Sequence, residues 1–534
     1  MDAAKAHDSS HSARELNSFD GIEDEGGHYN DVGILDKGYT SKDQRDMQRM
    51  GKRQELIRNF RPLSALAFTA LLQATWEFTL IANTQVLVCG GLAGFFWTYV
   101  WTFFGFGIVM TSLAEMASMC PTSGGQYHWV SEFAPPEYQK GLSYLTGWMS
   151  TLSWQAGTAS GSFLTGTIIQ ALIQINNSDY EPKAWQGTLL VFAMVLVLWF
   201  ANTYGARDLP LVQNVLLIVH VFAFLATIIV LWVMAPRNSA EVAFTQFTNN
   251  GGWSTMGLAL MVGQISVIYG SLCSDCTAHM AEEVKDAGRN VPNAMFWAYV
   301  SNGILGFILV ITYNFTMTDV DSALDDPTGY PFIWLFQQAV SLRGVNALTI
   351  IILILVIASN ISFNASTSRQ TFAFARDHGL PFSRWLGTVH PKLHIPQNAV
   401  TVTCICSCLL ALINIGSETA FNAIISLQVC ALMFSYTISI SCVLYRRLYY
   451  QELLPKARWS LGKLGIPINA IGIVYSIFAF FWSFWPNETP VDAETFNWAI
   501  VLFFSTMIIC GVLYLVRGRK VYTGPVVTVK HDVY

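Results

Sequence analysis

Charged side chains are scarce in this chain of 534 residues. Asp, Glu, Lys and Arg make up 12% of it, whereas an average globular domain carries about 25%, and hydrophobic residues make up 53%. A surface that faces water on all sides cannot be built from this composition, which excludes a water-soluble globular protein. The net charge of -5 comes partly from an acidic N-terminal stretch, residues 9–33, and we expect no nucleic-acid partner.

The motifs of several enzyme classes are also missing. The chain has no GxxxxGK[ST] phosphate loop, no HExxH zinc motif and no GxSxG nucleophile elbow. We therefore expect no enzymatic activity, no cofactor and no pumping driven by ATP. The ten cysteines lie mostly inside apolar runs, which argues against a secreted disulfide framework. Cys273 and Cys276 have CxxC spacing without a second pair nearby, so no metal site is expected.

Long runs without charge take the place of these motifs. Each of four runs exceeds the roughly 20 residues that span a bilayer: 141–175, 253–274, 345–368 and 419–445. The first apolar run begins near Leu63 behind a long polar tail, so we expect it to be retained and not cleaved as a signal peptide. The pattern predicts an all-α integral membrane protein of about twelve transmembrane helices, beginning near Leu63, Gly94, Gly141, Trp185, Pro210, Trp253, Ala294, Val345, Gln397, Thr419, Ile466 and Thr495.

The linkers between these helices differ in charge. One set contains only Lys183, Arg237 and Arg343, and the other contains Lys140, Arg207, Lys285, Arg289, Arg369, Arg376, Arg384, Lys392, Arg446, Arg447, Lys456, Arg458 and Lys463. Basic residues favour the cytoplasmic side, which predicts that the richer set and both termini are cytoplasmic. Two glycosylation sequons fall in the predicted outer linkers, and we expect Asn176 and Asn487 to be the acceptors.

Ten of the predicted helices divide into two sets of five, and the first helix of each set carries an embedded acid, Glu77 or Asp275. An odd number of helices per repeat places the two halves in opposite orientations, as in many secondary transporters. We therefore expect a cytoplasmic disordered tail, a transporter domain and a cytoplasmic C-terminal tail. Their ranges are 1–60, 61–517 and 518–534, with repeat 1 at about 61–235, repeat 2 at about 253–445 and helices 11–12 at about 466–517.

Three segments, in order along the chain, resemble a known superfamily. They are AEMASMCPTSGGQYHW (114–129), SDCTAHMAEEVKDAGRNVP (274–292) and SRQTFAFARDHGLP (368–381). They are similar to the signatures that follow the second, sixth and eighth helices of the amino acid-polyamine-organocation superfamily. The TWE string of the first helix, the histidine of the fifth and the HMAEE string most resemble the fungal amino acid/choline transporter family, which includes permeases for GABA and choline.

This resemblance implies a LeuT-type fold, a 5+5 inverted repeat followed by two further helices. In that fold the first and sixth helices are broken at mid-membrane and hold the substrate between them. A broken helix bares backbone polar groups, which are tolerated only where they line a cavity. The chain departs from the superfamily pattern in two places. The first helix, QATWEF, has no glycine, and the usual aromatic-x-Gly-x-acid run is replaced by Ser271, Cys273 and Asp275, with Tyr269 and Gly270 upstream.

Glu77 lies in the middle of an otherwise uncharged run, residues 63–89. Its presence requires an explanation, because a carboxylate in the middle of a membrane helix costs roughly 2.5 to 3.5 kcal/mol. A helix N-terminus, a bound amine or a proton would each offset the cost. Glu77 is either a structural acid bonded to a neighbouring helix or the group that contacts the amine of the substrate. In the second case Trp76 supplies a cation-π face, and Thr75 belongs to the same site.

The remaining predicted substrate residues come from the third and sixth helices. Trp154 and Gln155 precede a run of small residues, 156–161, that lets another helix approach closely. The resemblance places that helix beside the substrate cavity, although an aromatic residue there also fits a packed or lipid-facing position. Tyr269, Gly270 and Asp275 complete the predicted site.

His220 is the only ionisable residue in the predicted fifth helix, and histidine titrates near physiological pH. The resemblance places it where some relatives carry a lysine thought to replace a sodium ion. It either couples transport to protons together with Glu77, or it is a neutral histidine hydrogen-bonded inside the bundle. A gate or scaffold set of ion pairs is expected at the cytoplasmic end, from Glu115, Glu282, Glu283 and Arg289.

These features predict a secondary active transporter of the plasma membrane, a proton symporter for a small amine-bearing solute such as an amino acid, GABA or choline. Its partners are then that solute, protons and the lipid bilayer. Two alternatives remain. One is a transporter of a small nitrogenous secondary metabolite, and the other is a nutrient sensor of the same fold that binds a solute without moving it.

Overall fold

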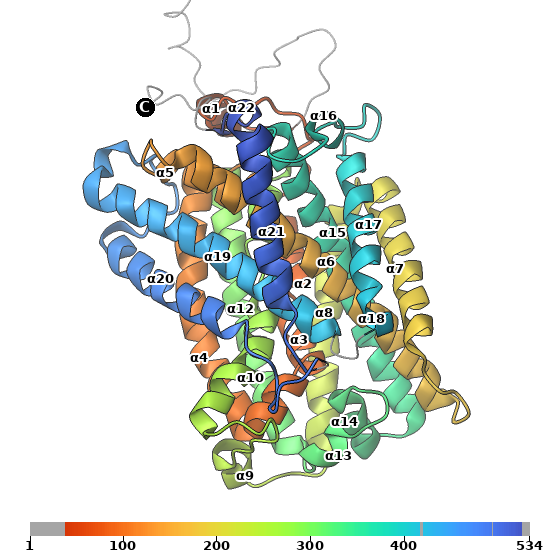
Figure 1. Ribbon diagram of the computed structural model, residues 1–534. Coiled ribbons are helices and arrows are strands. Elements are labelled where there is room, and N and C mark those ends of the chain that lie inside the picture. The colour runs from red at the N-terminus through yellow and green to blue at the C-terminus, as the bar shows by residue number, and fades with distance from the viewer. Residues whose placement is uncertain (1–37, 417–419, 494, 526–534) are drawn as a thin grey trace, which may run out of the picture. The chain divides into compact units, whose positions relative to one another are not determined.

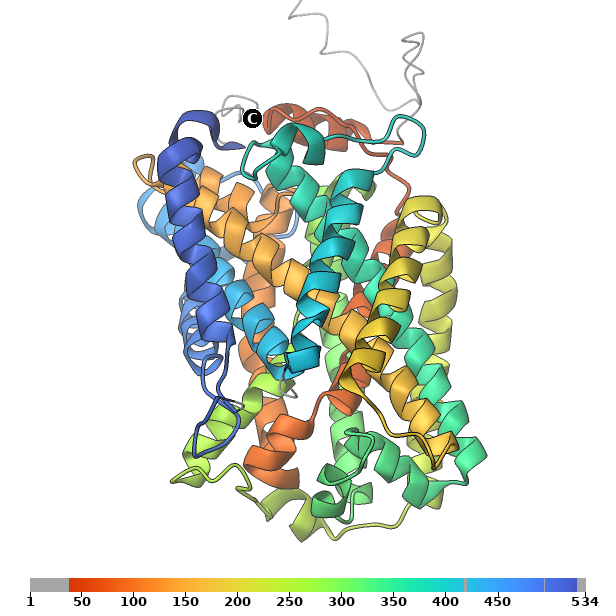
Figure 2. The ribbon, with the colours of Figure 1, turned by 45° about the vertical axis from the view of Figure 1, so that its right-hand side comes forward.

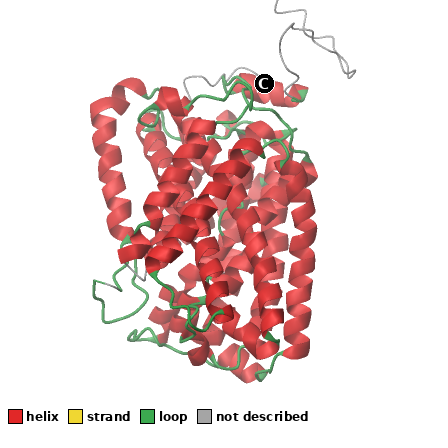
Figure 3. Ribbon diagram, turned by 90° about the vertical axis from the view of Figure 1, so that its right-hand side faces the viewer, coloured by secondary structure: helices red, strands yellow, loops and turns green. Residues whose placement is uncertain are grey.

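The structure is a computed structural model that describes residues 38–416, 420–493 and 495–525. Over these ranges the chain forms helices and no strand, apart from an isolated parallel bridge between Phe60 and Val284. Figure 3 shows helices throughout, joined by loops at their ends. The all-helical membrane class expected from the composition is confirmed.

The long helices, together with the short α3 and α18 that continue the lines of α2 and α17, lie side by side (Figure 1). They are α2 (Pro62–Gln73), α3 (Thr75–Ile81), α4 (Thr84–Met119), α6 (Gln139–Asn176), α7 (Ala184–Tyr204), α8 (Leu209–Met234), α10 (Met256–Ser271), α12 (Ala287–Thr316), α15 (Leu342–Arg376), α17 (Gln397–Ala411), α18 (Ile413–Gly416), α19 (Ala420–Tyr449), α20 (Gly465–Trp482) and α21 (Ala499–Leu513). The short helices are α1 (Ser41–Arg49), α5 (Gln126–Phe133), α9 (Ala240–Thr245), α11 (Cys276–His279), η1 (Ala281–Glu283), α13 (Val320–Leu324), α14 (Pro331–Ala339), α16 (Ser383–Leu386), η2 (Gln451–Leu453), η3 (Gly462–Leu464), η4 (Tyr514–Gly518) and α22 (Arg519–Val521).

Ten stretches of helix in the described chain are long and apolar enough to cross a membrane, and α2 and α3 together make the first of them. The helix α6, with 38 residues, and α10, with 16, lie outside this set. The count of twelve therefore stays a prediction. The helix expected near Thr419 is described from Ala420 onward, since residues 417–419 lie outside the described residues.

The second long helix begins ten residues earlier than predicted, at Thr84 and not near Gly94. Gly91 lies inside it with a non-helical backbone at φ 62. A side chain there would meet Thr248, because an added Cβ would lie 2.5 Å from the Thr248 hydroxyl. The glycine thus allows a kink that joins two helical pieces, which the uncharged sequence did not reveal.

The described helices define two ends of the bundle. α1, α16 and α22 lie at one end, called the α1 end below, and α9, α13 and α14 lie at the other, called the α9 end (Figures 1 and 2). Between these ends, small residues let helices approach closely. A Cβ added to Gly161 on α6 would lie 2.6 Å from Asn360 Oδ1 on α15, and one added to Gly157 would lie 2.9 Å from Gln428 on α19. The close helix approach expected of residues 156–161 is confirmed.

Residues 38–60 are folded, although the sequence predicts a disordered tail over residues 1–60. Thr40 caps α1 by accepting a hydrogen bond from the Asp43 backbone, and the apolar residues Met47, Met50, Leu56 and Phe60 are buried. In the sequence, these apolar residues are widely spaced and separated by charged residues, a pattern that is typical of disorder. They are buried only because other parts of the folded chain cover them. The prediction of disorder is wrong for residues 38–60, and residues 1–37 lie outside the described residues.

The predicted C-terminal tail, 518–534, is also structured in its described part. α22 follows η4 directly, and the Tyr522 hydroxyl lies 2.6 Å from Ser143 Oγ on α6. Tyr522 is fully buried. Residues 518–525 therefore belong to the packed body, and residues 526–534 lie outside the described residues.

Candidate functional site

The first candidate site element is the junction between α2 and α3. Ala74 separates them in a left-handed conformation (φ 40, ψ 47), which residues other than glycine rarely adopt. The side chains next to it face inward and are buried. The hydroxyls of Thr75 and Thr79 have no hydrogen-bond partner among the described residues.

The second element is the junction between α10 and α11. α10 continues through Tyr269 and Gly270 and ends at Ser271, after which Cys273 has a positive φ of 69. Two contacts bring this junction beside the first one. Gln73 donates a hydrogen bond to the Ser271 carbonyl at 3.2 Å, and the hydroxyls of Thr69 and Thr277 contact each other.

Gly270 makes the approach between α10 and α3 possible. A Cβ placed there would lie 3.0 Å from Thr79 Oγ1 and 3.8 Å from the Thr75 carbonyl oxygen. Tyr269, beside it, turns its ring edge toward Phe78 on α3, with the ring centroids 5.5 Å apart. Its hydroxyl lies 3.1 Å from Ser160 Oγ on α6. Three helices therefore meet at the predicted position of the substrate.

Glu77 contacts His220 at the centre of this region. Glu77 Oε1 on α3 lies 2.7 Å from His220 Nδ1 on α8, and both side chains are at most 1% exposed. The indole Nε1 of Trp76 lies 3.2 Å from the same Nδ1. Glu77 Oε2 and His220 Nε2 have no partner within the part of the chain that the structure describes. The carboxyl thus faces the interior of the bundle and not the lipid.

One proton decides how this contact is made. If Nδ1 carries hydrogen, it donates to an ionised Glu77 and cannot accept from Trp76. If Nδ1 is bare, it accepts from Trp76, and the proton must sit on Glu77 for the short oxygen contact to be attractive. With a neutral ring, the first arrangement has a bare Nε2 and an ionised Glu77, and the second has hydrogen on Nε2 and a protonated Glu77, so the two differ by one proton and by the tautomer of the ring. In the first arrangement Nε2 can accept a further proton and Glu77 Oε2 can accept a hydrogen bond from a ligand.

The two residues predicted in the third helix point in different directions. Trp154 is buried and meets His279 edge to face with centroids 4.9 Å apart, and its Nε1 has no partner among the residues described. It is therefore packed inside and does not face lipid. Gln155 donates hydrogen bonds to Thr371 on α15 and Thr403 on α17, so it joins α6 to these two helices.

Asp275 belongs to a second buried group. Its Oδ2 accepts a hydrogen bond of 2.6 Å from Gln126 on α5 and lies 4.0 Å from His279 Nε2. His279 Nδ1 lies 3.0 Å from the Ser123 carbonyl, which can only accept, so Nδ1 carries the hydrogen and Nε2 is bare in the neutral ring. Sequence reasoning missed Gln126 and His279, although the i,i+4 spacing from Asp275 to His279 indicates proximity.

The acids predicted for a gate or scaffold all lie toward the α1 end. Arg376 forms two hydrogen bonds with Glu282, at 2.8 and 2.9 Å, and Arg369 bonds Glu283 at 2.7 Å. Burial acts to raise the pKa of Glu282, but the Arg376 guanidinium, the Lys52 charge and the Ser123 backbone amide together outweigh it and hold that pKa at about 2. Glu282 is therefore ionised at every physiological pH.

The predicted cation of these ion pairs, Arg289, is not among the arginines that form them. Glu115 pairs with Arg447 and also accepts a bond of 2.9 Å from the Leu461 backbone. Arg289 is exposed and belongs to no ion pair of the described chain. Arg369 and Arg376 are seven residues apart on α15, which is about two helical turns. This spacing predicts that the two side chains lie on the same face of the helix.

The ten stretches of the described chain that are long and apolar enough to cross a membrane define a multi-pass membrane protein. Residues 60–510 match the family model described as amino acid permease. Because the match covers most of the chain, the protein belongs to that family, within the amino acid-polyamine-organocation superfamily.

Three curated relatives show how the similarity is distributed. A putative amino acid/polyamine transporter of Macrophomina phaseolina is 30% identical, over 81% of this chain and 96% of the relative. The choline transporter of Saccharomyces cerevisiae is 29% identical over 77% and 72%, and the GABA-specific permease of the same yeast is 25% identical over 94% and 89%.

The fold is also found among solved structures. A manganese transporter of Eremococcus coleocola superposes with a TM-score of 0.50 over 95% of this chain and 97% of that one, at 12% sequence identity. This likeness concerns the fold alone.

Proposed function

We propose that this permease is a secondary active transporter of a small amine-bearing solute such as an amino acid, GABA or choline, and that protons drive it. The observation that carries the proposal is the buried contact of Glu77 with His220 beside the α2–α3 and α10–α11 junctions. The names of the yeast relatives, a choline transporter and a GABA-specific permease, support the solute class.

The solute amine is assigned to the free Glu77 Oε2. Thr75 and Thr79 supply hydroxyls with unused hydrogen-bonding capacity, and Trp76 and Tyr269 supply aromatic surface near them. Gly270 keeps α10 close to α3, and Trp154 with Asp275 closes the site on the side of α11. Gln155 positions α6 through its bonds to α15 and α17. The solute passes without chemical change.

A count of charges in the closed site indicates which solutes require a proton. With Glu77 ionised and His220 neutral, the site holds one negative charge. A quaternary ammonium such as choline neutralises it, whereas a zwitterion such as GABA leaves it uncompensated until His220 Nε2 takes a proton. Because an uncompensated charge is costly away from water, we expect zwitterions to enter with a proton and choline to enter without one.

Flux into proteoliposomes tests the proposal. Radiolabelled GABA, choline and amino acids are offered with and without an inward proton gradient, and accumulation of at least one of them is expected. Binding without flux would instead identify a sensor. If zwitterion accumulation is insensitive to both the gradient and an uncoupler, the proton-driven part of the proposal fails.

We further propose that the α1 end faces the cytoplasm and that the protein resides in the plasma membrane. The basic linker residues support this orientation, since most of them belong to the same side as the termini. The sequons of Asn176 and Asn487 belong to linkers of the other side, and Asn176 is exposed. Loss of a glycosidase-sensitive mass shift in Asn176→Gln and Asn487→Gln variants tests the assignment.

A further inference from the structure

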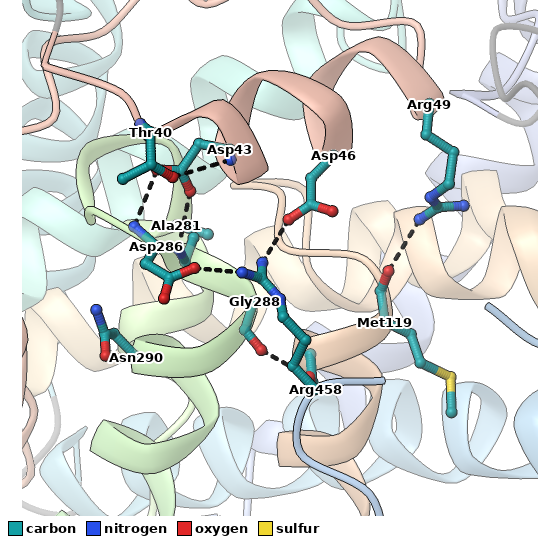
Figure 4. Close-up of polar contacts among 12 residues, drawn as sticks. Thr40, Asp43, Asp46, Arg49, Met119, Ala281, Asp286, Gly288, Asn290 and Arg458 are labelled. Atoms are coloured by element: carbon teal, nitrogen blue, oxygen red, sulfur yellow. Dashed lines mark hydrogen bonds and ion pairs between the residues drawn. The ribbon is translucent and has the colours of Figure 1, made fainter. Parts of the chain in front are cut away.

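The segment Gly38–Phe60, called the 38–60 segment below, bonds to several separate parts of the α1 end, namely the ends of α4 and α15, the helix α5 and the start of α12. Its helix α1 crosses the start of α12 and the junction after α4, and Arg458 stands between Asp46 and Asp286 (Figure 4). A tail that merely rested on the surface would make a few exposed contacts. The contacts of this segment are largely buried and involve charged groups.

The strongest contact is made with the start of α12. The Asp43 carboxylate accepts hydrogen bonds of 2.9 Å from the backbone amides of Asp286 and Ala287. Those amides have no partner inside the helix, and the positive end of the helix dipole favours a carboxylate there. Arg58 lies 3.4 Å from Asp43, and both side chains are at most 1% exposed. Asp43 thus caps a helix from a distant part of the chain.

The end of the 38–60 segment pairs with the residues that follow α11. The Phe60 amide donates to the Glu283 carbonyl, and the Lys285 amide donates to the Phe60 carbonyl, each at 3.0 Å. Arg58 donates to the carbonyls of Ala281 and Val284. This stretch also carries Glu282, which Arg376 holds. The segment therefore fixes the connection between α11 and α12 by its backbone.

Two further ion pairs extend the attachment to α5 and to the end of α15. Arg49 pairs with Glu132 and donates to the Met119 carbonyl at 2.9 Å, and Lys52 pairs with Asp377. The contacts join α4, α5, α12 and α15 through one short stretch of chain. Any movement that separates these elements must break some of them.

We propose that the 38–60 segment is a releasable latch, which holds the α1 end closed and must detach before a solute passes there. The proposal rests on the proposed function in one respect, that solute passage requires the α1 end to open. The outer pairs of Arg458 are partly exposed and weak, whereas the Asp43 contacts are buried. Release therefore depends mainly on Asp43 and Arg58.

The alkylation rate of Cys120 measures detachment of the 38–60 segment and requires no transport measurement. Its thiol is fully buried, with Arg49 at 3.3 Å and Glu132 at 2.8 Å. Burial, reinforced by the Glu132 carboxylate, raises the pKa of this thiol well above its ordinary value, so it reacts slowly while covered. Alkylation by N-ethylmaleimide, read by peptide mass spectrometry, measures how often the segment lifts. Cys89, buried near Gly251 and Asn487, is the internal control.

In purified full-length protein, Asp43→Asn is expected to speed alkylation of Cys120 by about tenfold or more, as for loss of a charged hydrogen bond. Asp46→Asn, at the exposed pair, is the matched control and is expected to change it little. Cys89 should not respond to either. An unchanged Cys120 rate in both Asp43→Asn and Arg58→Gln overturns the latch, and so does a parallel rise at Cys89, which would indicate general unfolding.

A covalent lock tests the requirement for release. Lys52→Cys and Asp377→Cys are combined and bridged with a bifunctional maleimide, and each single variant treated alike is the control. Bridged protein is expected to lose solute flux that the single variants retain, and full flux in bridged protein overturns the proposal. If wild-type protein shows no flux while Cys120 still responds to Asp43→Asn, the proposed function fails, and the releasable attachment of the segment through Asp43 is supported independently of it.

Discussion

Glu77 Oε1 and His220 Nδ1 lie 2.7 Å apart, although 143 residues separate them in the chain. The contact joins α3 to α8, the helix at each end of the predicted first repeat. Both groups are buried, and each keeps one polar atom without a partner among the described residues. The proposed roles of these two residues in amine binding and proton coupling rest on this contact.

Replacing Glu77 by Gln tests the role of the acid. Gln keeps the size of the side chain but removes the charge, so the solute amine loses its counter-ion. Uptake of radiolabelled solute is expected to fall by about 100-fold or more, the scale for truncating a buried charge pair. Surface biotinylation should show a normal amount of protein. Near-normal uptake by this variant would make Glu77 a purely structural acid.

His220→Gln separates proton coupling from packing. Gln retains hydrogen-bonding atoms for Glu77 and Trp76 but does not titrate, so residual zwitterion uptake is expected to lose its pH dependence and its sensitivity to an uncoupler. Gln213 is a matched control on the same helix, buried and bonded to Ser362 at 2.6 Å. Gln213→Ala should keep the wild-type pH profile. An unaltered profile in His220→Gln removes histidine from the coupling.

The Arg376–Glu282 pair predicts how stability depends on pH. The pKa of Glu282 falls from 4.5 to about 2 in the folded protein, so its contribution to stability is complete above 4.5 and is lost as pH falls toward 2. Arg376→Gln leaves a buried carboxylate unpaired and is expected to cost about 3 kcal/mol at neutral pH. The unfolding temperature in detergent should drop clearly. Arg289→Gln, at an exposed arginine, should change it little, and equal effects would contradict the ion-pair assignment.

The glycines of α10 provide a test of helix approach. Gly270→Ala places a Cβ 3.0 Å from the Thr79 hydroxyl, which forces α10 and α3 apart by a few tenths of an ångström. Uptake is expected to fall several-fold through a raised KM, since the predicted binding surfaces lie on both helices. Gly257, on the same helix, has no atom within 4 Å of its added Cβ. Gly257→Ala should therefore leave uptake unchanged, and equal kinetics in the two variants would count against a site between α3 and α10.

Much of the architecture could be predicted because the bilayer restricts the choice. Uncharged runs of sufficient length indicate helices, and three motif segments identified the superfamily. The residues at which individual helices begin and end were harder to predict. Gly91 permits a kink that lengthens α4 toward its N-terminus, and nothing in an uncharged sequence distinguishes such a glycine from a packing glycine.

The partners of the buried acids could not be predicted, because linker charge indicates a side of the membrane but not which side chains meet. Arg289 was expected in the ion-pair set, yet it is exposed, and Arg376 takes the role beside Glu282. Glu77 and His220 were each recognised from their unusual position inside an apolar helix. Their contact depends on the crossing of α3 and α8, which only the folded chain determines.

The 38–60 segment was predicted to be disordered, but it is folded. Its sequence has the composition of a solvated tail, and its apolar residues are too few to fold alone. Asp43, Arg49 and Arg58 instead find partners on α12, α5 and the stretch after α11. Order here is supplied by the rest of the protein, and local composition carries no signal of it.

The ion pairs made by lysine and arginine in the described chain all lie at the α1 end, among them Glu115–Arg447, Glu282–Arg376 and Lys52–Asp377. Because these ion pairs are buried, dissolved salt screens them less than it screens exposed pairs. The α9 end is joined by hydrogen bonds, such as the backbone bond of 2.8 Å from the Thr489 amide to the Gly251 carbonyl and the bond of 3.0 Å from Asn250 to the Asp321 carboxylate. The two ends of the bundle are therefore held together by different kinds of contact, ion pairs at the α1 end and hydrogen bonds at the α9 end.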